Sequence, residues 1–282
     1  MSTIRFQKWQ GAGNDFIIID NRDNQFVALN ADLISRLCDR HFGIGADGLM
    51  LIGPSKDFDF EMIFYNSDGY PAEMCGNGGR CIAAMASQSG IFSKKTTFLT
   101  TDGPHEAEVA REDWIRLRMT EIKGIELVKI PILEPLAIGN ATFLNTGVPH
   151  LVVFVNDLES VNVETAGRTL RNLDQFSPAG TNVNFVKVVG QTLYVRTYER
   201  GVEGETLACG TGNVAAAVAA EWTFNSGFSE YDCVALGGRL KVSFNRHGKN
   251  RFTDVWLEGP AMKVYEGTIV LPDKKTTETR RT

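Results

Sequence analysis

The sequence lacks a long hydrophobic run: its longest apolar stretches, NVAAAVAA and LVVFV, are far shorter than a bilayer span. The segment MSTIRFQKWQ also lacks the apolar core of a secretory signal. Basic residues cluster only in DKKTTETRRT, and a net charge of −5 over 282 residues offers no surface for nucleic acid or anionic lipid. We therefore expect a cytoplasmic protein with no membrane and no nucleic-acid partner.

Cysteine is also sparse. The chain has five cysteines, an odd number spread thinly, which argues against a secreted disulfide framework. Cys75 and Cys81 are too far apart for the C-x-x-C spacing of zinc or thioredoxin-type sites, and no histidine lies near them in sequence. The glycine-rich loops match neither the Walker A pattern nor G-x-G-x-x-G. No metal or nucleotide site is expected.

Two similar segments stand out against this background. AEMCGNGGRC and ETLACGTGNV each carry a cysteine, a short run of Gly, Asn or Thr, and the start of a small-residue helix. Their cysteines, Cys75 and Cys209, are 134 residues apart, close to half the chain. The flanking segments also recur in order: GAGNDFIIID matches the place of TGVPHLVVFV, and FEMIFYNSDG that of LYVRTYERG. An internal duplication is the simplest interpretation, although recurring strand and helix patterns can imitate a repeat.

The duplication predicts an α+β fold of two pseudo-symmetric domains. Runs rich in Ile, Val and Phe predict strands, and helices are expected near residues 33–40 and 163–173 and after each motif cysteine. We place the first domain at residues 1–120, with 264–282 packing back onto it, and the second at 121–263. The segment KGIELVKIPILEPLAIGN, with its two prolines, is expected to be a connector.

Each motif predicts a cysteine at the start of a helix. The helix dipole then favours the thiolate and lowers the thiol pKa, while free backbone N–H groups and glycines offer a place for an anion. Two such loops facing each other would hold a carboxylate and place its α-carbon between two sulfurs. One thiolate could remove the α-proton and the opposite thiol return one to the other face, as a racemase or epimerase requires.

Other interpretations remain open for the cysteines. A papain-like pair of one cysteine and one histidine would leave the second loop unexplained. Buried cysteine usually behaves as a small hydrophobe, and we expect this of Cys38, Cys81 and Cys233. Two facing thiols also raise the possibility that Cys75 and Cys209 form a disulfide in an empty site.

At these motifs the chain resembles the diaminopimelate epimerase family. The resemblance runs from GAGNDFIIID through DRHFGIGADGL, FYNSDGYPAEMCGNGGRC, GTNVNFV and YERGVEGETLACGTG to WLEGPA, nearly the whole chain. It implies two domains, each a mixed sheet or barrel wrapped round a central helix, with a site between them. It also implies a homodimer that interconverts LL- and meso-diaminopimelate in lysine and peptidoglycan precursor synthesis, without pyridoxal phosphate or metal.

The resemblance assigns roles by position. Cys75 and Cys209 would be the acid/base pair, and His150 would help to set their protonation. The reacting carboxylate would lie on the first helical residues of both loops, and the distal amino and carboxylate groups of the substrate on polar side chains elsewhere. The substrate-binding set is Asn14, Asn66, Gly76, Asn77, Asn182, Glu199, Arg200, Gly210 and Thr211.

Four of these residues also have a purely structural interpretation. Asn14 could only support a turn, Glu199 and Arg200 could form a surface ion pair, and His150 could be a structural residue. The chain also departs from the family pattern at Val148, where an Asn often touches the distal carboxylate, and at Gly48, where some members carry Gln. Asn213 and Val214 depart inside the second helix, where little effect on chemistry is expected.

Two rival functions follow from the same features. A proline or hydroxyproline racemase shares the two-cysteine logic but takes a cyclic imino acid. A catalytically silent ligand-binding relative, similar in fold to the phenazine-pathway isomerases, predicts that one or both cysteines are replaced, whereas both are present here.

Overall fold

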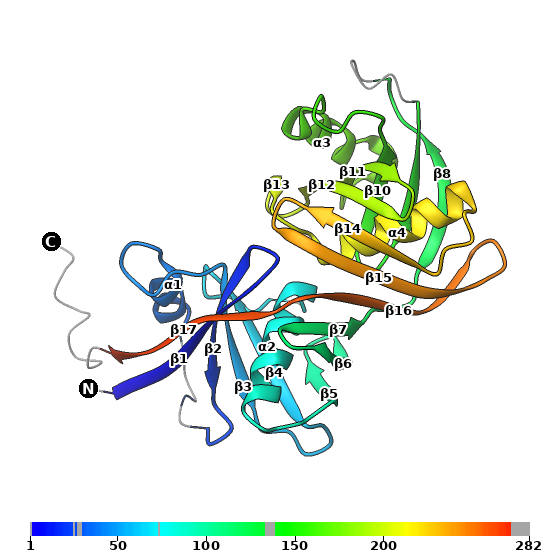
Figure 1. The fold of residues 1–282 in the computed structure, drawn as a ribbon. Helices are drawn as coiled ribbons and strands as arrows, with labels where there is room; N and C mark the ends of the chain where they lie inside the picture. The colour runs from blue at the N-terminus through cyan, green and yellow to red at the C-terminus, as the bar shows by residue number, and fades with distance from the viewer. Residues whose placement is uncertain (1, 25, 27–29, 73, 133–138, 272–282) are drawn as a thin grey trace, which may run out of the picture.

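The computed structural model describes residues 2–24, 26, 30–72, 74–132 and 139–271, and it forms two lobes joined by strands (Figure 1). The first lobe contains helix α1 (Ala31–Cys38), capped by Asn30, and helix α2 (Gly76–Gln88). Its strands are β1 (Ser2–Gly11), β2 (Asn14–Asp20), β3 (Gly48–Gly53), β4 (Phe60–Asn66), β5 (Lys95–Thr100), β6 (Gly103–Arg111) and β7 (Trp114–Arg118). Consecutive strands pair antiparallel, parallel, antiparallel, parallel, antiparallel and antiparallel.

The second lobe contains helix α3 (Val163–Arg171), helix α4 (Gly210–Phe224) and a short 3-10 helix, η1 (Asp174–Phe176). Its strands are β8 (Lys123–Lys129), β9 (Asn140–Asn145), β10 (Pro149–Phe154), β11 (Asn182–Val189), β12 (Thr192–Glu199), β13 (Gly204–Thr206), β14 (Glu230–Ala235), β15 (Gly238–His247) and β16 (Arg251–Pro260). From β9 to β16, with the three-residue β13 set aside, the pairings repeat the pattern of the first lobe. The α+β fold with two similar halves is thus confirmed.

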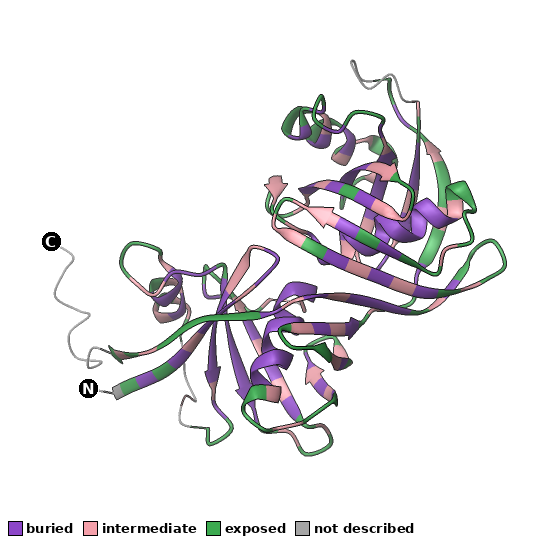
Figure 2. Ribbon diagram, viewed as in Figure 1, coloured by how far each residue is buried: buried purple, intermediate pink, exposed green. Residues whose placement is uncertain are grey.

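A central helix occupies the core of each lobe. Residues 76–86 of α2 are buried under the first sheet, and Gly210, Gly212 and residues 213–221 of α4 under the second (Figure 2). Helix α4 is apolar all round, as expected for a helix enclosed by a sheet rather than lying on one face of it. The alanines at 215–217, 219 and 220 have no exposed surface, so their small side chains let the strands approach the helix closely.

Two strands hold the lobes together. β16 pairs with β15 of the second lobe and, from Trp256 to Pro260, with β7 of the first. The chain then continues into β17 (Met262–Leu271), which pairs antiparallel with β1. Residues 272–282, which were also expected to pack on the first domain, lie outside the described residues, and the domain boundaries themselves remain a prediction.

The expected connector is partly wrong. Residues 123–129 form β8, which pairs antiparallel with β9 and adds a strand to the second sheet. Three of these residues, Ile125, Leu127 and Val128, are apolar, and Ile125 packs on the core around α4. The two prolines that suggested a connector, at positions 131 and 135, follow this strand rather than interrupt it. Residues 133–138 lie outside the described part of the chain.

The close fit around α4 predicts the effect of enlarging a buried alanine. Ala217→Leu should lower the free energy of unfolding by roughly 1–3 kcal/mol, because the added carbons have no space among the strands. Ala110→Leu, at an exposed position of β6, is the control and should change stability by less than about 0.5 kcal/mol. Urea unfolding followed by circular dichroism measures both, and equal effects would contradict the tight packing of α4.

Candidate active site

The two motif cysteines occupy equivalent places in the two lobes. Cys75 is the N-cap residue of α2 and Cys209 that of α4, with similar extended backbone angles (φ −107°, ψ 130° and φ −101°, ψ 113°). Neither side chain bonds to its own helix as a cap, so both sulfurs remain available for other contacts. The backbone N–H groups of the first helical turn lie directly behind each sulfur, as the motifs predicted.

The N-termini of α2 and α4 meet at two glycines. A Cβ atom on Gly210 would lie 3.0 Å from Cδ2 of Leu257 and, at ordinary contact distance, 3.6 Å from Cα of Gly76, so glycine at this position leaves room for Leu257 beside the contact. A hydrogen bond of 3.0 Å from Nδ2 of Asn77 to the carbonyl oxygen of Ala208 joins the two loops. The fold therefore brings the two cysteine loops together, although they are distant in sequence.

A cavity of about 910 Å³ opens beside this contact, with walls from both lobes. Four of the expected site residues line it: Cys75, Asn14, Asn66 and Glu199. Phe16, Phe64 and Leu207 supply apolar surface, and Asp47 and Asp68 add carboxylates. A cavity with an apolar wall, a few polar groups and a cysteine at a helix N-terminus has the features of a binding site for a small polar molecule.

The Cys75 thiol is half-buried, and its Sγ lies 3.7 Å from Oδ1 of Asn14. Burial raises the pKa of this thiol, whereas the backbone N–H groups of Gly78 and Asn77 lower it. The negative charge of Glu199 raises the pKa further. The helix terminus lowers the thiol pKa, as the sequence indicated, but the expected net lowering is wrong, because loss of hydration is the larger effect.

Cys209 is more deeply placed, with 6% of its surface exposed, and its Sγ lies 3.4 Å from Oγ1 of Thr211. Burial again raises the pKa of the thiol, and Glu199 and Cys75 raise it further, while Thr211 and the N–H of Gly212 lower it. A charge on Cys75 thus opposes a charge on Cys209. Two thiols coupled in this way favour one thiolate and one thiol over two thiolates.

Glu199, at the end of β12, acts on both cysteines. Burial raises the pKa of its carboxyl group, and its charge raises the pKa of each thiol. It lines the cavity, and the described residues record no ion pair between Glu199 and Arg200. The alternative of a surface ion pair is therefore not supported by the structure.

The remaining expected residues form a second group behind Cys209. Nδ2 of Asn182 donates to the carbonyl oxygen of Pro149 (3.1 Å), and its Oδ1 accepts the N–H of Arg200 (2.8 Å). Thr146 donates through Oγ1 to the carbonyl oxygen of Thr211 (3.3 Å). Asn182, Arg200 and Thr211 are not among the residues that line the cavity beside Cys75.

His150 belongs to this second group and is fully buried. Its Nδ1 lies 3.1 Å from Nδ2 of Asn184, so Nδ1 accepts a hydrogen bond and the proton resides on Nε2. Nε2 has no partner among the described residues. Burial, aided by the positive charge of Arg200, lowers the pKa of His150 to about 3, so the imidazole is neutral at physiological pH.

A network that sequence reasoning missed holds Asn14 in place. The amide nitrogen of Asn14 donates to Asp47, and Arg40 bonds to both Asp47 (2.8 Å) and Asp15 (2.7 and 3.0 Å). Burial alone would raise the pKa of Asp15, but Arg40 and Lys8 outweigh it and hold that pKa well below its usual range. Asn14 thus points its Oδ1 toward Cys75 rather than only supporting a turn. The sequence feature that could have predicted this network is the stretch DRHFGIGADG, in which Arg40 and Asp47 lie on either side of two glycines.

Two departures from the family pattern have a structural explanation. A Cβ atom on Gly48 would lie 2.6 Å from both Cε2 of Phe64 and the carbonyl oxygen of Tyr65, so Phe64 fills the space of any side chain there. Val148 accepts the N–H of Thr146 through its carbonyl oxygen (3.1 Å) and is not among the cavity-lining residues. Near Gly48, the wall of the cavity is therefore formed by the ring of Phe64.

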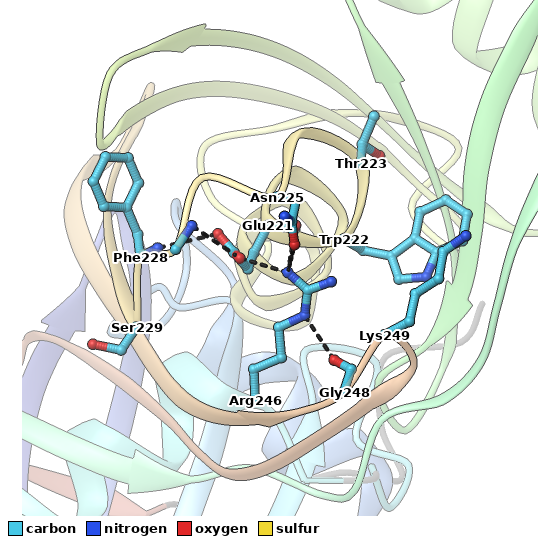
Figure 3. A pocket seen from close by; sticks show the side chains of 10 residues that line it. Glu221, Trp222, Thr223, Asn225, Phe228, Ser229, Arg246, Gly248 and Lys249 are labelled. Carbon is cyan, nitrogen blue, oxygen red and sulfur yellow. Dashed lines mark hydrogen bonds and ion pairs between the residues drawn. The ribbon is translucent and has the colours of Figure 1, made fainter.

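A second cavity, of about 830 Å³, lies at the other end of α4 (Figure 3). There Arg246 forms an ion pair of 2.6 Å with Glu221, whose carboxylate also accepts the N–H groups of Gly227 and Phe228. These groups satisfy one another and anchor the end of the helix. The three other cysteines are buried and free, as expected, and the described residues contain no cluster of His, Cys, Asp and Glu able to hold a metal.

Comparisons with known proteins agree on one family. The model of a family described as diaminopimelate epimerase matches residues 6–124 and 142–264. A diaminopimelate epimerase of Flavobacterium psychrophilum is 46% identical over 267 residues, covering 94% of this chain and all of that protein. One of Chlorobaculum tepidum is 42% identical over 270 residues, covering 93% of this chain and 99% of that protein.

Solved structures show the same fold at low identity. A PhzF-family phenazine biosynthesis protein of Bacillus anthracis has a TM-score of 0.74 at 15% identity, covering 96% of this chain and all of that one. No helix in the described residues is long and apolar enough to cross a membrane.

The buried neutral imidazole predicts how stability depends on pH. The unfolded chain binds a proton at His150 near pH 6.5, whereas the folded chain does so only near pH 3, so this histidine makes stability fall as pH drops through that window. Between pH 7 and pH 5 the loss should be about 2 kcal/mol. His150→Gln should remove that part of the decline in urea unfolding, whereas the exposed His41→Gln should not; an unchanged decline in His150→Gln would refute a neutral buried His150.

Proposed function

Because the chain belongs to the diaminopimelate epimerase family and is therefore an isomerase, we propose that it interconverts LL- and meso-2,6-diaminopimelate with Cys75 and Cys209 as its two acid/base groups. The observation that carries the proposal is the contact between the N-termini of α2 and α4 at Gly76 and Gly210. That contact brings together the two helix N-termini that carry the thiols, and on this ground we place the two sulfurs on opposite sides of the reacting carbon.

The reaction follows from this geometry. The substrate carboxylate lies against the N–H groups of Gly76, Asn77, Gly210 and Thr211, where both helix dipoles favour negative charge. One cysteine, as thiolate, takes the α-proton, and the opposite thiol gives its proton to the other face of the carbon. One proton is removed and one returned, so the pair ends with its protonation states exchanged. The same N–H groups stabilise the charge that builds up on the carboxylate as the carbanion forms.

The coupling between the thiols suits this chemistry. Glu199 and the opposite sulfur both oppose a second thiolate, so the site holds one base and one acid at a time. Burial raises both thiol pKa values in the empty site, which makes a thiolate there a stronger base toward the α-proton. We infer that neither pyridoxal phosphate nor a metal takes part, since the family acts without them.

The distal end of the substrate would lie in the cavity beside Cys75. Glu199 would pair with the distal ammonium group, and Asn14 and Asn66 would accept or donate hydrogen bonds there. Arg200, whose backbone N–H is bound by Asn182, does not line this cavity, so it would bind the distal carboxylate only after its side chain turns toward Glu199. With Phe64 occupying the space at Gly48, the distal groups are bound without a side chain from that position.

Two other functions are less well supported. A hydroxyproline epimerase of Agrobacterium vitis, solved with bound trans-4-hydroxy-L-proline, shares the fold at a TM-score of 0.67, 16% identity and coverage of 96% of this chain and 94% of that one. A cyclic imino acid, however, has no distal amine for Glu199 or for the polar end of a 910 Å³ cavity. A silent binding protein would not need both cysteines. We place the reaction in lysine and peptidoglycan precursor synthesis in the cytoplasm.

Removing either sulfur tests the two-base proposal. Cys75→Ala and Cys209→Ala should each lower the rate of LL-diaminopimelate epimerisation by at least about a hundredfold, the usual contribution of a positioned acid or base. Proton NMR in heavy water measures both epimerisation and α-proton exchange, and proline serves as the rival substrate. Cys38→Ala, in α1, is the control and should keep wild-type turnover. Near-normal epimerisation in either the Cys75 or the Cys209 variant would contradict the two-base proposal. Turnover of proline but not of diaminopimelate would instead favour a proline racemase.

We also propose a homodimer. Strand β17 pairs with β1 along one edge, and no strand in the described residues pairs with its other edge. This strand exposes Met262 (45%), Val264 (57%) and Val270 (56%), which share one face because alternate residues of a strand point the same way. A long apolar edge strand left open is prone to pair with another chain, and a second copy would cover it symmetrically.

A charge on that strand tests the dimer. Val264→Lys should shift the molar mass in light scattering at micromolar concentration from two chains toward one, because like charges would face each other across the two-fold axis. Val189→Lys, at a position 52% exposed in the other lobe, is the control and should leave the mass unchanged. A wild-type monomer, or a Val264→Lys variant that stays dimeric, would contradict this interface.

A further inference from the structure

Arg80 is the one buried arginine beside the cysteines, and the mechanism above does not use it. It lies in the first turns of α2, five residues after Cys75, with 0% of its surface exposed. No carboxylate among the described residues pairs with it, and its Nε has no hydrogen-bond partner there. Burying a guanidinium without a counter-ion is costly, so such a residue calls for an explanation.

The contacts of Arg80 lead to both cysteine loops. Its Nη1 donates to the carbonyl oxygen of Gly76 (3.1 Å), and its Nη2 donates to Oδ1 of Asn77 (2.8 Å). With its oxygen so engaged, Asn77 directs its amide nitrogen to the carbonyl oxygen of Ala208, the residue before Cys209 (3.0 Å), and toward Oδ1 of Asn14 (3.5 Å). Arg80 thus fixes the orientation of the amide that joins the two loops.

The surrounding chain is shaped to admit this side chain. A Cβ atom on Gly259 of β16 would lie 3.2 Å from Nε of Arg80, 3.4 Å from its Cζ and 2.3 Å from Cδ2 of Leu240. Only glycine at this position leaves room for the guanidinium plane between the strand and the helix. The site therefore contains a fitted place for a buried positive charge, and no carboxylate in the described part of the chain neutralises it.

The second lobe has no equivalent. The residue five positions after Cys209 is Val214, which is buried and apolar. Two charged or titratable groups act on Cys209, Glu199 and Cys75, and both oppose its ionisation. For Cys75 the groups are Glu199, which opposes ionisation, and Arg80, which favours it. The two cysteines therefore differ in the charges around them, although the backbones of their two motifs are nearly symmetric.

We propose that Arg80 is a positioning residue that orients Asn77 between the two loops and places a buried cation beside Cys75, so that Cys75 ionises before Cys209. The inference rests on the proposed two-thiol function, since it assigns which thiol is the base before substrate arrives. In that state Cys75 is the thiolate, Cys209 is the thiol, and substrate of the configuration that presents its α-proton to Cys75 reacts first.

The test titrates each thiol without turnover. Wild type and Arg80→Met are treated with iodoacetamide from pH 6 to 11, a range that extends above the ordinary thiol pKa because burial raises the pKa of both thiols, and peptide mass spectrometry gives the alkylation rate of Cys75 and Cys209 separately. The midpoint of each rate profile reports ionisation, whereas its plateau reports access. We expect a lower midpoint for Cys75 than for Cys209 in wild type. In Arg80→Met the Cys75 midpoint should rise by on the order of one to two pH units, with a much smaller change at Cys209.

Three further variants separate charge from structure. Arg80→Lys keeps the positive charge but not the fork, and should keep the Cys75 midpoint close to wild type. Arg80→Gln is a second neutral variant, read instead if Arg80→Met does not fold, and should shift the midpoint as Arg80→Met does. Arg246→Met removes the half-buried arginine at the far end of α4 (Figure 3), about 20 Å from Cys209, and should leave both midpoints unchanged.

Several outcomes would overturn the proposal. These are an unchanged Cys75 midpoint in a folded neutral variant, equal shifts at both cysteines, or a wild-type midpoint lower at Cys209. Because no substrate is present, the titration remains informative if the protein fails to epimerise diaminopimelate. Conversely, a confirmed titration with no epimerisation would leave the charge assignment in place and remove only the proposed reaction.

Discussion

The contact between Gly76 and Gly210 is the constraint on which the rest of the site depends. Both residues at the contact are glycines, and a Cβ atom on Gly210 or Gly76 would lie 3.0 or 3.3 Å from Cδ2 of Leu257, so a side chain at either position would require Leu257 to move. The positive ends of two helix dipoles repel each other, so the contact is stable only with acceptors nearby. The carbonyl oxygen of Ala208, bound by Asn77, is one such acceptor in the empty site, and a substrate carboxylate would be a better one.

Burial and electrostatics act in opposite directions at the thiols. The enclosed helices that place the cysteines also remove water from them, and this loss raises the pKa of both thiols in spite of the helix N–H groups. A base that must take a proton from carbon benefits from such an environment, but it needs a local positive charge to ionise at all. The fold supplies fixed dipoles to both thiols, and the buried guanidinium of Arg80 adds a full charge near one of them.

The sequence predicted those features of the fold and of the site that occur in both halves of the chain. The two cysteines, the helices after them and the α+β duplication were visible because the chain repeats them at matching places. The link from Arg80 through Asn77 to Ala208 was not, because it joins residues 131 positions apart and depends on side-chain orientation. Strand β8 was mistaken for a connector because nearby prolines outweighed its weak alternation. The Asp47 and Arg40 network was missed because charged residues in a loop usually face solvent.

An unequal pair of thiols is consistent with the reaction proposed here. A racemase that interconverts mirror images faces two substrates of equal free energy, and a symmetric site suits it. LL- and meso-diaminopimelate are diastereomers that share the same distal centre and differ only at the reacting carbon. The distal groups fix the molecule in one direction, so the two thiols never exchange environments. A duplicated fold can then lose its symmetry residue by residue, as at Arg80 and Val214, while its backbone still places a cysteine at the N-terminus of each central helix.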